Sequence, residues 1–253
     1  INDFNADDAK HKTWTLKEGV VKINGYNPQP GDVKFKDLRT DGVINAGDNT
    51  VDNPGDRKII GNDAARYQFG ISLGASYKGW SLEVLLQGVG KRDYWLGGPA
   101  MFPFGGAGAG DAVFQALYAN QTDYWRAKSY DPSSSDYMVP VNPDSKLFRI
   151  YDQGNNVGSN TRVSDKYLQN AAYMRIKNIT LAYTLPKEWV RRAFIQDAKF
   201  YLSIENLATF SSLPKGYDPE GTAPSSTANA LSNGISWGYP YYRTISLGAS
   251  ITF

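Results

Sequence analysis

Oxygen-bearing side chains recur in the segment 37–48 at nearly the spacing of an EF-hand calcium loop. Gly42 stands where such a loop turns sharply, and the candidate ligands at positions one, five, nine and twelve are Asp37, Asp41, Asn45 and Asp48. Two residues depart from the pattern, because Arg39 occupies the place of a third oxygen ligand and Asp48 replaces the bidentate glutamate. The segment is a candidate Ca²⁺ or Mg²⁺ site, and the alternative is a polar turn whose Asp and Asn side chains bond to the backbone.

Aromatic residues gather in two long segments, 88–172 and 207–242. Because aromatic faces stack on sugar rings, these segments are candidates for lining a glycan site. The residues that we predict to contact the ligand are Trp95, Trp125 and Trp237. The alternative is that loops of this length need small cores of their own, which aromatic side chains supply.

Residues suited to enzymatic chemistry are scarce. His11 is the single histidine and cysteine is absent, which argues against a histidine-based triad, a zinc site and thiolate catalysis. Asp218 and Glu220 form a carboxylate pair of the kind that glycosidases use, but local chemistry of a proline-containing turn is the simpler account. The glycine-rich run 97–110 lacks a phosphate-loop lysine. We therefore predict no catalytic residues.

The composition excludes two classes of protein. The 253 residues are 41% hydrophobic, which suffices for a folded chain, and their net charge of +2 lacks the basic excess typical of nucleic-acid binding. No run approaches about 18 consecutive apolar residues, so a transmembrane helix is excluded.

Alternation of apolar and polar residues predicts five β-strands. Two of them, 67–77 and 80–86, flank Lys78-Gly79 and form a predicted hairpin. The others are 173–183, 198–205 and 244–253. In the strand 173–183 the apolar phase slips by one residue, which predicts a β-bulge near Lys177-Asn178.

Strands with one apolar and one polar face occur in two kinds of fold. A soluble antiparallel β-sandwich buries the apolar face on a second sheet. A transmembrane β-barrel turns it toward lipid, uses strands of about ten residues and places aromatic residues at their ends. The second pattern is favoured here, because Tyr67, Tyr77, Trp80 and Tyr183 stand at strand ends. Short and long connections also alternate, as periplasmic turns and extracellular loops do in outer-membrane barrels.

Five strands cannot close a barrel, since the smallest have about eight. Together with the first residue, Ile1, this predicts that the sequence is the C-terminal part of a longer chain. We expect residues 1–66 to be an extracellular loop region with a partial strand. We expect residues 67–253 to be the C-terminal barrel strands and their extracellular loops.

Several sequence blocks resemble the SusC/RagA-type TonB-dependent outer-membrane transporters of the Bacteroidetes. The blocks are the segment YMRIKNITLAYTLP at 173–186, GYDPE at 216–220, the hairpin 69–87, the last strand ending at Phe253, and, upstream, 31–37, Asp41-Gly42 and 59–62. The similarity extends from about Gly31 to Phe253 in the order found in that family.

The resemblance implies an antiparallel transmembrane β-barrel of 22 strands in the cell outer membrane, with a plug domain and earlier strands that are absent from this sequence. It implies TonB-dependent import of an oligosaccharide or a peptide, with a SusD-like surface lipoprotein as partner and TonB engaged through the absent N-terminal region. The alternative is a soluble β-sandwich glycan-binding module of a secreted protein.

Basic residues surround a tryptophan in the short connection 184–197. Lys187, Arg191 and Arg192 flank Trp189, a pattern typical of an interfacial helix with the indole at headgroup depth. Ordinary solvated charge is the alternative.

Overall fold

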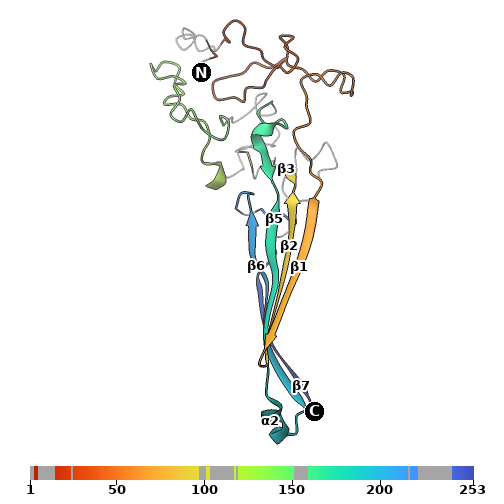
Figure 1. Cartoon of the computed structure of the whole chain (residues 1–253). Helices are drawn as coiled ribbons and strands as arrows, with labels where there is room; N and C mark the ends of the chain where they lie inside the picture. Colours follow the sequence, from red (N-terminus) through yellow and green to blue (C-terminus); the bar gives the residue numbers. More distant parts are fainter. Residues whose placement is uncertain are drawn as a thin grey trace. The chain divides into compact units, whose positions relative to one another are not determined.

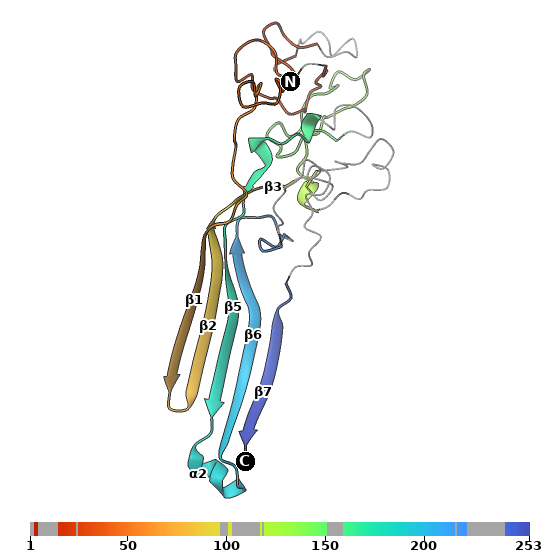
Figure 2. The same cartoon turned by 90° about the vertical axis from the view of Figure 1, so that its right-hand side faces the viewer.

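Five long strands form one antiparallel sheet, in which each strand pairs with the next long strand along the chain. The computed structural model describes residues 3–4, 15–23, 25–96, 101–102, 117, 119–150, 159–215, 217–221 and 241–253. The sheet order is β1 (Arg66–Tyr77), β2 (Trp80–Lys91), β5 (Tyr173–Thr184), β6 (Asp197–Ser211) and β7 (Thr244–Thr252), as Figures 1 and 2 show. The five predicted strands and their antiparallel arrangement are confirmed.

Helical structure in the described part of the chain is short. It includes η3 (Ala119–Gln121), η4 (Asp165–Tyr167), α2 (Lys187–Val190) and η5 (Arg191–Ala193). Ser159 and Asn160 are also helical. None of these segments has the length and apolar composition that a membrane-crossing helix requires.

One face of the sheet is a ladder of apolar side chains in register across all five strands. One row contains Leu73, Val84, Ile179, Ile204 and Ile245, and the next contains Ala75, Leu82, Leu181, Leu202 and Leu247. Many of these side chains are exposed, Leu247 to 83% and Leu73 to 56%. The apolar face is therefore largely uncovered by the described part of the chain.

A row of aromatic rings crosses the apolar face at the end of the sheet that carries the β1–β2 turn. Tyr77 pairs with Trp80, Trp80 with Tyr183, and Tyr183 with Phe200. The ring centroids of Trp80 and Tyr183 are 4.7 Å apart. The row follows from the period of two, which brings the terminal aromatic residue of each strand to the same face.

The β1–β2 turn has the two-residue geometry of a type I′ hairpin. Lys78 and Gly79 both have positive φ, 46° and 85°. A Cβ at Gly79 would lie 2.8 Å from the carbonyl oxygen of Thr184. Both the backbone conformation and the available space therefore favour glycine.

The predicted bulge is confirmed at Lys177, which has no partner in either ladder of β5. This extra residue moves the apolar phase from Met174 and Ile176 to Ile179 and Leu181. The ladder between β5 and β6 also skips Asn206 and Leu207, and Asn206 has a φ of 51°. Because the polar Asn206 interrupts the alternation, the sequence predicts β6 only as far as residue 205, whereas the strand continues to Ser211.

A second compact unit contains the described residues of Ile1–Ile60 and Trp95–Tyr167. Its core consists of apolar clusters, and its pairing before Arg66 is by isolated bridges such as Ile23 with Ile44. Two short strands, β3 (Asp93–Trp95) and β4 (Leu168–Asn170), pair with each other and, apart from Trp95, belong to the unit of the five-stranded sheet. The division of the chain after residue 66 stays a prediction.

Candidate functional site

The polar face of the sheet carries hydrogen-bonding side chains in register. The amide nitrogen of Asn178 donates to Ser203 Oγ at 3.0 Å, and the Thr180 hydroxyl donates to Asn178 Oδ1 at 2.8 Å. Glu83 lies beside Thr180 in the adjacent strand. Because these residues alternate with the apolar rows, each strand presents polar side chains on one face of the sheet and apolar side chains on the other.

Arg175 of β5 is the central residue of a buried ion cluster at the end of the sheet that lies away from the β1–β2 turn. Its side chain is 3% exposed. Nη2 donates to Asp218 Oδ1 at 2.7 Å, Nη1 donates to Glu220 Oε2 at 2.5 Å, and Nε donates to Thr209 Oγ1 at 2.8 Å. The guanidinium therefore uses all three of its nitrogens, a geometry that a lysine cannot reproduce.

Lys177 balances the charge of the cluster. Its Nζ lies 2.8 Å from Glu220 Oε2 and 3.0 Å from Oε1. Two cations thus face two carboxylates, so burial leaves no charge uncompensated, which is the condition for tolerating buried ions. The bulge at Lys177 and the period of two together bring both cations to the segment 217–221.

Asp218 is held as a carboxylate. Burial raises its pKa, but the backbone N–H groups of Glu220 and Tyr241 and the guanidinium of Arg175 outweigh this effect, so the pKa is lowered from 3.8. The two backbone bonds to Asp218 are 3.0 Å and 3.2 Å long. The segment 217–221 is therefore attached both to β5 and to the chain entering β7.

Tyr241 covers the two cations with its ring. The ring centroid lies 4.5 Å from Lys177 Nζ and 5.1 Å from Arg175 Cζ, within the range of cation–π contacts. Because the side chain is still 55% exposed, part of it remains accessible to a ligand.

This arrangement can hold a loop in place, and it does not resemble an acid–base catalyst. Glycosidases keep one of their two carboxyl groups protonated by raising its pKa. Here the pKa of Asp218 is lowered, and Glu220 is paired with Arg175 and Lys177.

The predicted metal ligands are close in sequence, and their oxygens accept hydrogen bonds from within the loop. Asp37 accepts the N–H groups of Thr40 and Gly42 at 2.7 Å and 2.8 Å. Asp41 Oδ2 lies 2.9 Å from Arg39 Nη2, which also donates to Asn45 Oδ1 at 3.2 Å.

Asp48 accepts the Asn53 side-chain amide at 2.7 Å. Asp56, which the sequence did not single out, accepts the N–H groups of Leu38, Arg39 and Asn45. Burial raises the pKa of Asp56, yet these bonds and the Arg39 cation lower it overall. Among the described residues no group of three or more Asp, Glu, His or Cys side chains is placed to hold a metal ion, and the metal site stays a prediction.

The three predicted ligand-binding tryptophans have different surroundings. Trp125 is 6% exposed and packs in a cluster with Phe4 and Met138. Its ring lies against Gly31, where a Cβ would come within 2.6 Å of the indole. Core packing thus accounts for Trp125 without a ligand, and its role in binding stays a prediction.

Trp95 of β3 packs against Phe102, with the ring centroids 6.0 Å apart. Its indole N–H is buried and has no hydrogen-bond partner in the described part of the chain. Trp237 lies outside the described residues.

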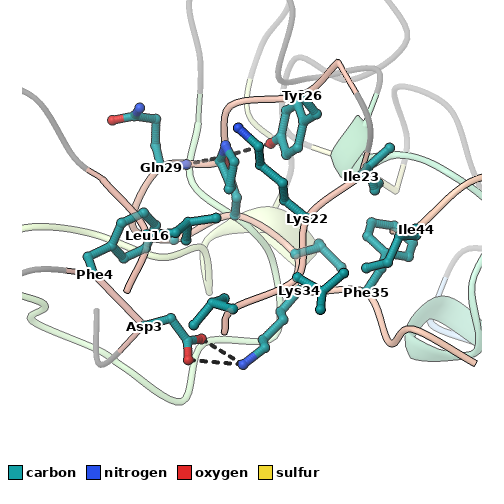
Figure 3. Close-up of a pocket in the computed structure, with 16 residues that line it drawn as sticks. Asp3, Phe4, Leu16, Lys22, Ile23, Tyr26, Gln29, Lys34, Phe35 and Ile44 are labelled. Carbon is teal, nitrogen blue, oxygen red and sulfur yellow. Dashed lines mark hydrogen bonds and ion pairs between the residues drawn. The ribbon is translucent and has the colours of Figure 1, made fainter. Parts of the chain in front are cut away.

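A small cavity of about 90 Å³ lies within the second unit (Figure 3). Its apolar lining includes Leu16 and Phe35, and Lys34 forms an ion pair of 2.9 Å with Asp3 at its edge. The Tyr26 hydroxyl donates to Asp32 Oδ2 at 2.6 Å. Ligand pockets usually measure about 300–1,000 Å³, so this cavity is too small to enclose an oligosaccharide or a peptide.

Sequence patterns alone do not identify Arg175, Lys177 and Tyr241 as members of a site. One signal was present, because two cations spaced by two residues on the polar phase of β5 match two carboxylates spaced by two in 216–220. Gly216 itself lies outside the described residues.

Two curated proteins of Formosa agariphila are similar to nearly the whole chain. TonB-dependent receptor P3 is 26% identical over 241 residues, covering 93% of this chain and 20% of its own length. TonB-dependent receptor P26 is 24% identical over 244 residues, covering 95% of this chain and 22% of its own length. The chain therefore spans about a fifth of the length of these relatives. No protein-family model matches it.

Solved structures of the RagAB peptide importer are also similar to the chain. The structure described as the RagAB peptide transporter is 23% identical with a TM-score of 0.43, and the closed-closed state is 24% identical with a TM-score of 0.42. Each match covers 74% of this chain and 17% of the other. The chain is thus similar over nearly its whole length to curated TonB-dependent receptors.

Proposed function

We propose that this chain contributes five neighbouring strands and extracellular loops to a large, closed outer-membrane β-barrel, of 22 strands as in the family. The barrel imports oligosaccharides or peptides, draws energy from TonB and works with a SusD-like surface lipoprotein. In this arrangement the apolar face of the sheet contacts lipid and the polar face lines the passage.

The exposed apolar face is the observation that carries this proposal. Leu247, Ile245 and Leu73, on the two edge strands, are 83%, 65% and 56% exposed. Leu82 and Leu181, on strands paired on both sides, are still 40% and 39% exposed. Contact of such an apolar surface with water is unfavourable, whereas its contact with lipid tails is not. The aromatic row from Tyr77 to Phe200 is what an interfacial girdle requires.

The ion cluster supports a role in cargo contact for the long connection between β6 and β7. It fixes the segment 217–221 at the sheet end where the long connections begin, which the proposal assigns to the extracellular mouth. A loop held by buried charges keeps its position when cargo arrives, so Tyr241 is presented at a constant place beside the passage.

Trp95 has the best support among the three candidate cargo contacts. A buried N–H without a partner is unfavourable, and a cargo hydroxyl or carbonyl would satisfy it. Trp95→Phe keeps the ring and removes only this donor. We expect this variant of the full-length transporter to bind cargo several-fold more weakly, with unchanged thermal stability.

The membrane assignment is tested by attaching a fluorophore to single cysteines on opposite faces of one strand. The chain has no cysteine of its own. In nanodiscs with brominated lipid, we expect quenching at Leu181→Cys and Leu247→Cys. The adjacent controls, Thr180→Cys and Ser246→Cys, should stay bright. Equal fluorescence at all four sites in a protein that remains aqueous would favour the soluble β-sandwich module instead.

Cargo is tested by uptake of labelled oligosaccharides and labelled peptides into cells that express the full-length transporter. Uptake that stops when TonB is deleted supports the proposal and identifies the cargo class. Uptake of neither class would contradict it.

A further inference from the structure

The connection between β5 and β6 is a firmly attached turn. Leu185 donates its backbone N–H to Ala198 at 2.9 Å, and Gln196 donates its N–H to Thr252 of β7 at 2.8 Å. Val190, the last residue of α2, is buried, at 4% exposure. The turn therefore has a fixed conformation and a defined outer surface.

Two aromatic side chains on this turn are exposed. Trp189 is 65% exposed and Phe194 is 93% exposed. Phe194 also has a φ of 59°, a left-handed conformation that a bulky residue rarely adopts. Two exposed aromatic rings on a fixed turn form an apolar surface that a neighbour outside the described chain would cover.

Three exposed cations accompany the two rings. Lys187, Arg191 and Arg192 take part in no ion pair within the described residues, and Glu188 is the one carboxylate among residues 187–194. Two positive charges are therefore in excess on this surface. Its complement is an anionic surface that also accepts aromatic rings.

The turn is continuous with the aromatic end of the apolar face. Tyr183 of β5 pairs with Phe200 of β6, and the turn joins these two strands directly beyond that row. Figure 2 shows α2 at the same end of the sheet as the C-terminus. If the apolar face lies in lipid, the cations of the turn reach the depth of the phosphate groups.

We propose that the segment 187–194, the basic turn, binds anionic phospholipid headgroups. Arg191 and Arg192 contact the lipid phosphate, for which the guanidinium fork is suited, and Lys187 adds charge. Trp189 and Phe194 insert at the boundary between headgroups and acyl chains. This inference rests on the proposed membrane location and goes beyond it, because it names a lipid class and the residues that select it.

The test is a titration of the detergent-solubilised full-length transporter with phosphatidylglycerol or phosphatidylcholine, with bound lipid counted by native mass spectrometry. We expect preference for phosphatidylglycerol. Each basic residue near an anionic surface contributes roughly a fivefold factor, so the triple variant K187Q/R191Q/R192Q should bind phosphatidylglycerol at least about tenfold more weakly. The control K22Q/K36Q/K91Q removes the same charge from three other exposed lysines and should leave the preference unchanged.

Three outcomes would overturn the inference: no lipid preference, an unchanged triple variant, or complete displacement of the lipid by inorganic phosphate, which would indicate a simple anion site. Arg192→Gln alone serves if the triple variant fails to fold, and should weaken binding severalfold. The quenching experiment at Leu181 and Thr180 separates this inference from the membrane proposal. Quenching without lipid preference refutes only the inference, whereas absence of quenching refutes the membrane location as well.

Discussion

The guanidinium of Arg175 and the carboxylate of Asp218 lie 2.7 Å apart although 43 residues separate them in the chain. Both side chains are almost fully buried. The pair joins the middle strand of the sheet to the segment 217–221, so the ion cluster holds this part of the long β6–β7 connection against β5. Substitutions that keep or break the charge balance measure how much the ion cluster contributes to the free energy of unfolding.

Arg175→Met should destabilise the folded protein by about 3–5 kcal/mol, since it leaves the Asp218 charge buried without a partner. Urea unfolding in detergent micelles measures this loss. The double variant R175M/D218N should be more stable than R175M, because Lys177 and Glu220 still form a balanced pair. Lys128→Met, which removes one member of an exposed pair, should cost less than about 1 kcal/mol. Equal losses in the two single variants would contradict the buried cluster.

Acid should loosen the attachment of the segment 217–221. The pKa of Asp218 is lowered in the folded protein from 3.8, so the ionised form is favoured by folding. Its stabilisation is present at neutral pH, begins to fall as the pH drops through about 3.8, and is lost below the native pKa. Hydrogen exchange of the Glu220 and Tyr241 amides, corrected for intrinsic rates, should accelerate in that range. In Asp218→Asn this acceleration should be smaller, and an unchanged profile would argue against Asp218 as the cause.

The sheet could be predicted from the sequence because the alternation of apolar and polar residues that marks each strand is a local pattern. Alternation defines each strand, and the phase slip at Lys177 revealed the bulge without knowledge of its neighbours. The second half of β6 was missed because Asn206 interrupts the local pattern, and only pairing with β5 restores it.

The candidate site could not be predicted in the same way, since its residues meet through strand register and loop path. Asp218 and Glu220 looked like partners in a local turn, and nothing local reveals that Arg175 lies beside them. Trp125 illustrates the same limit, because an aromatic residue in a long loop has the same sequence pattern whether it packs internally or faces a ligand.

Gly79→Ala should destabilise the β1–β2 hairpin. The left-handed conformation costs a non-glycine residue roughly 1–2 kcal/mol, and the new Cβ would contact the Thr184 carbonyl oxygen. Gly74→Ala in β1 is the matched control, since its Cβ would meet nothing within 4 Å and its φ lies outside the left-handed region. The midpoint of urea unfolding should fall for the first variant and stay or rise slightly for the second. A similar fall in both would show that loss of glycine flexibility is not specific to the turn.

Charge should be tolerated on one face of β7 and not on the other. Leu247→Arg places a cation on the apolar face near the middle of the strand, which costs about 2–4 kcal/mol at the centre of a bilayer. Ser246→Arg places the same cation on the polar face and should cost little. Refolding of the full-length protein into vesicles measures both. Equal tolerance would contradict the lipid-facing assignment of the apolar ladder.

The Arg39 cation is the feature that decides whether the loop 37–48 can take a metal ion. Its Nη2 lies between Asp41 and Asn45, two of the predicted oxygen ligands, and a divalent ion at this position would be repelled. Arg39→Ala should therefore raise the affinity of the loop for Ca²⁺ above that of the native chain. Adding Asp37→Asn to this variant should abolish the gain, because it removes a charged ligand. Isothermal titration of the three proteins with Ca²⁺ provides the comparison. If Arg39→Ala binds no more tightly than the native chain, the loop is a polar turn and its carboxylates serve the backbone N–H groups that they already accept.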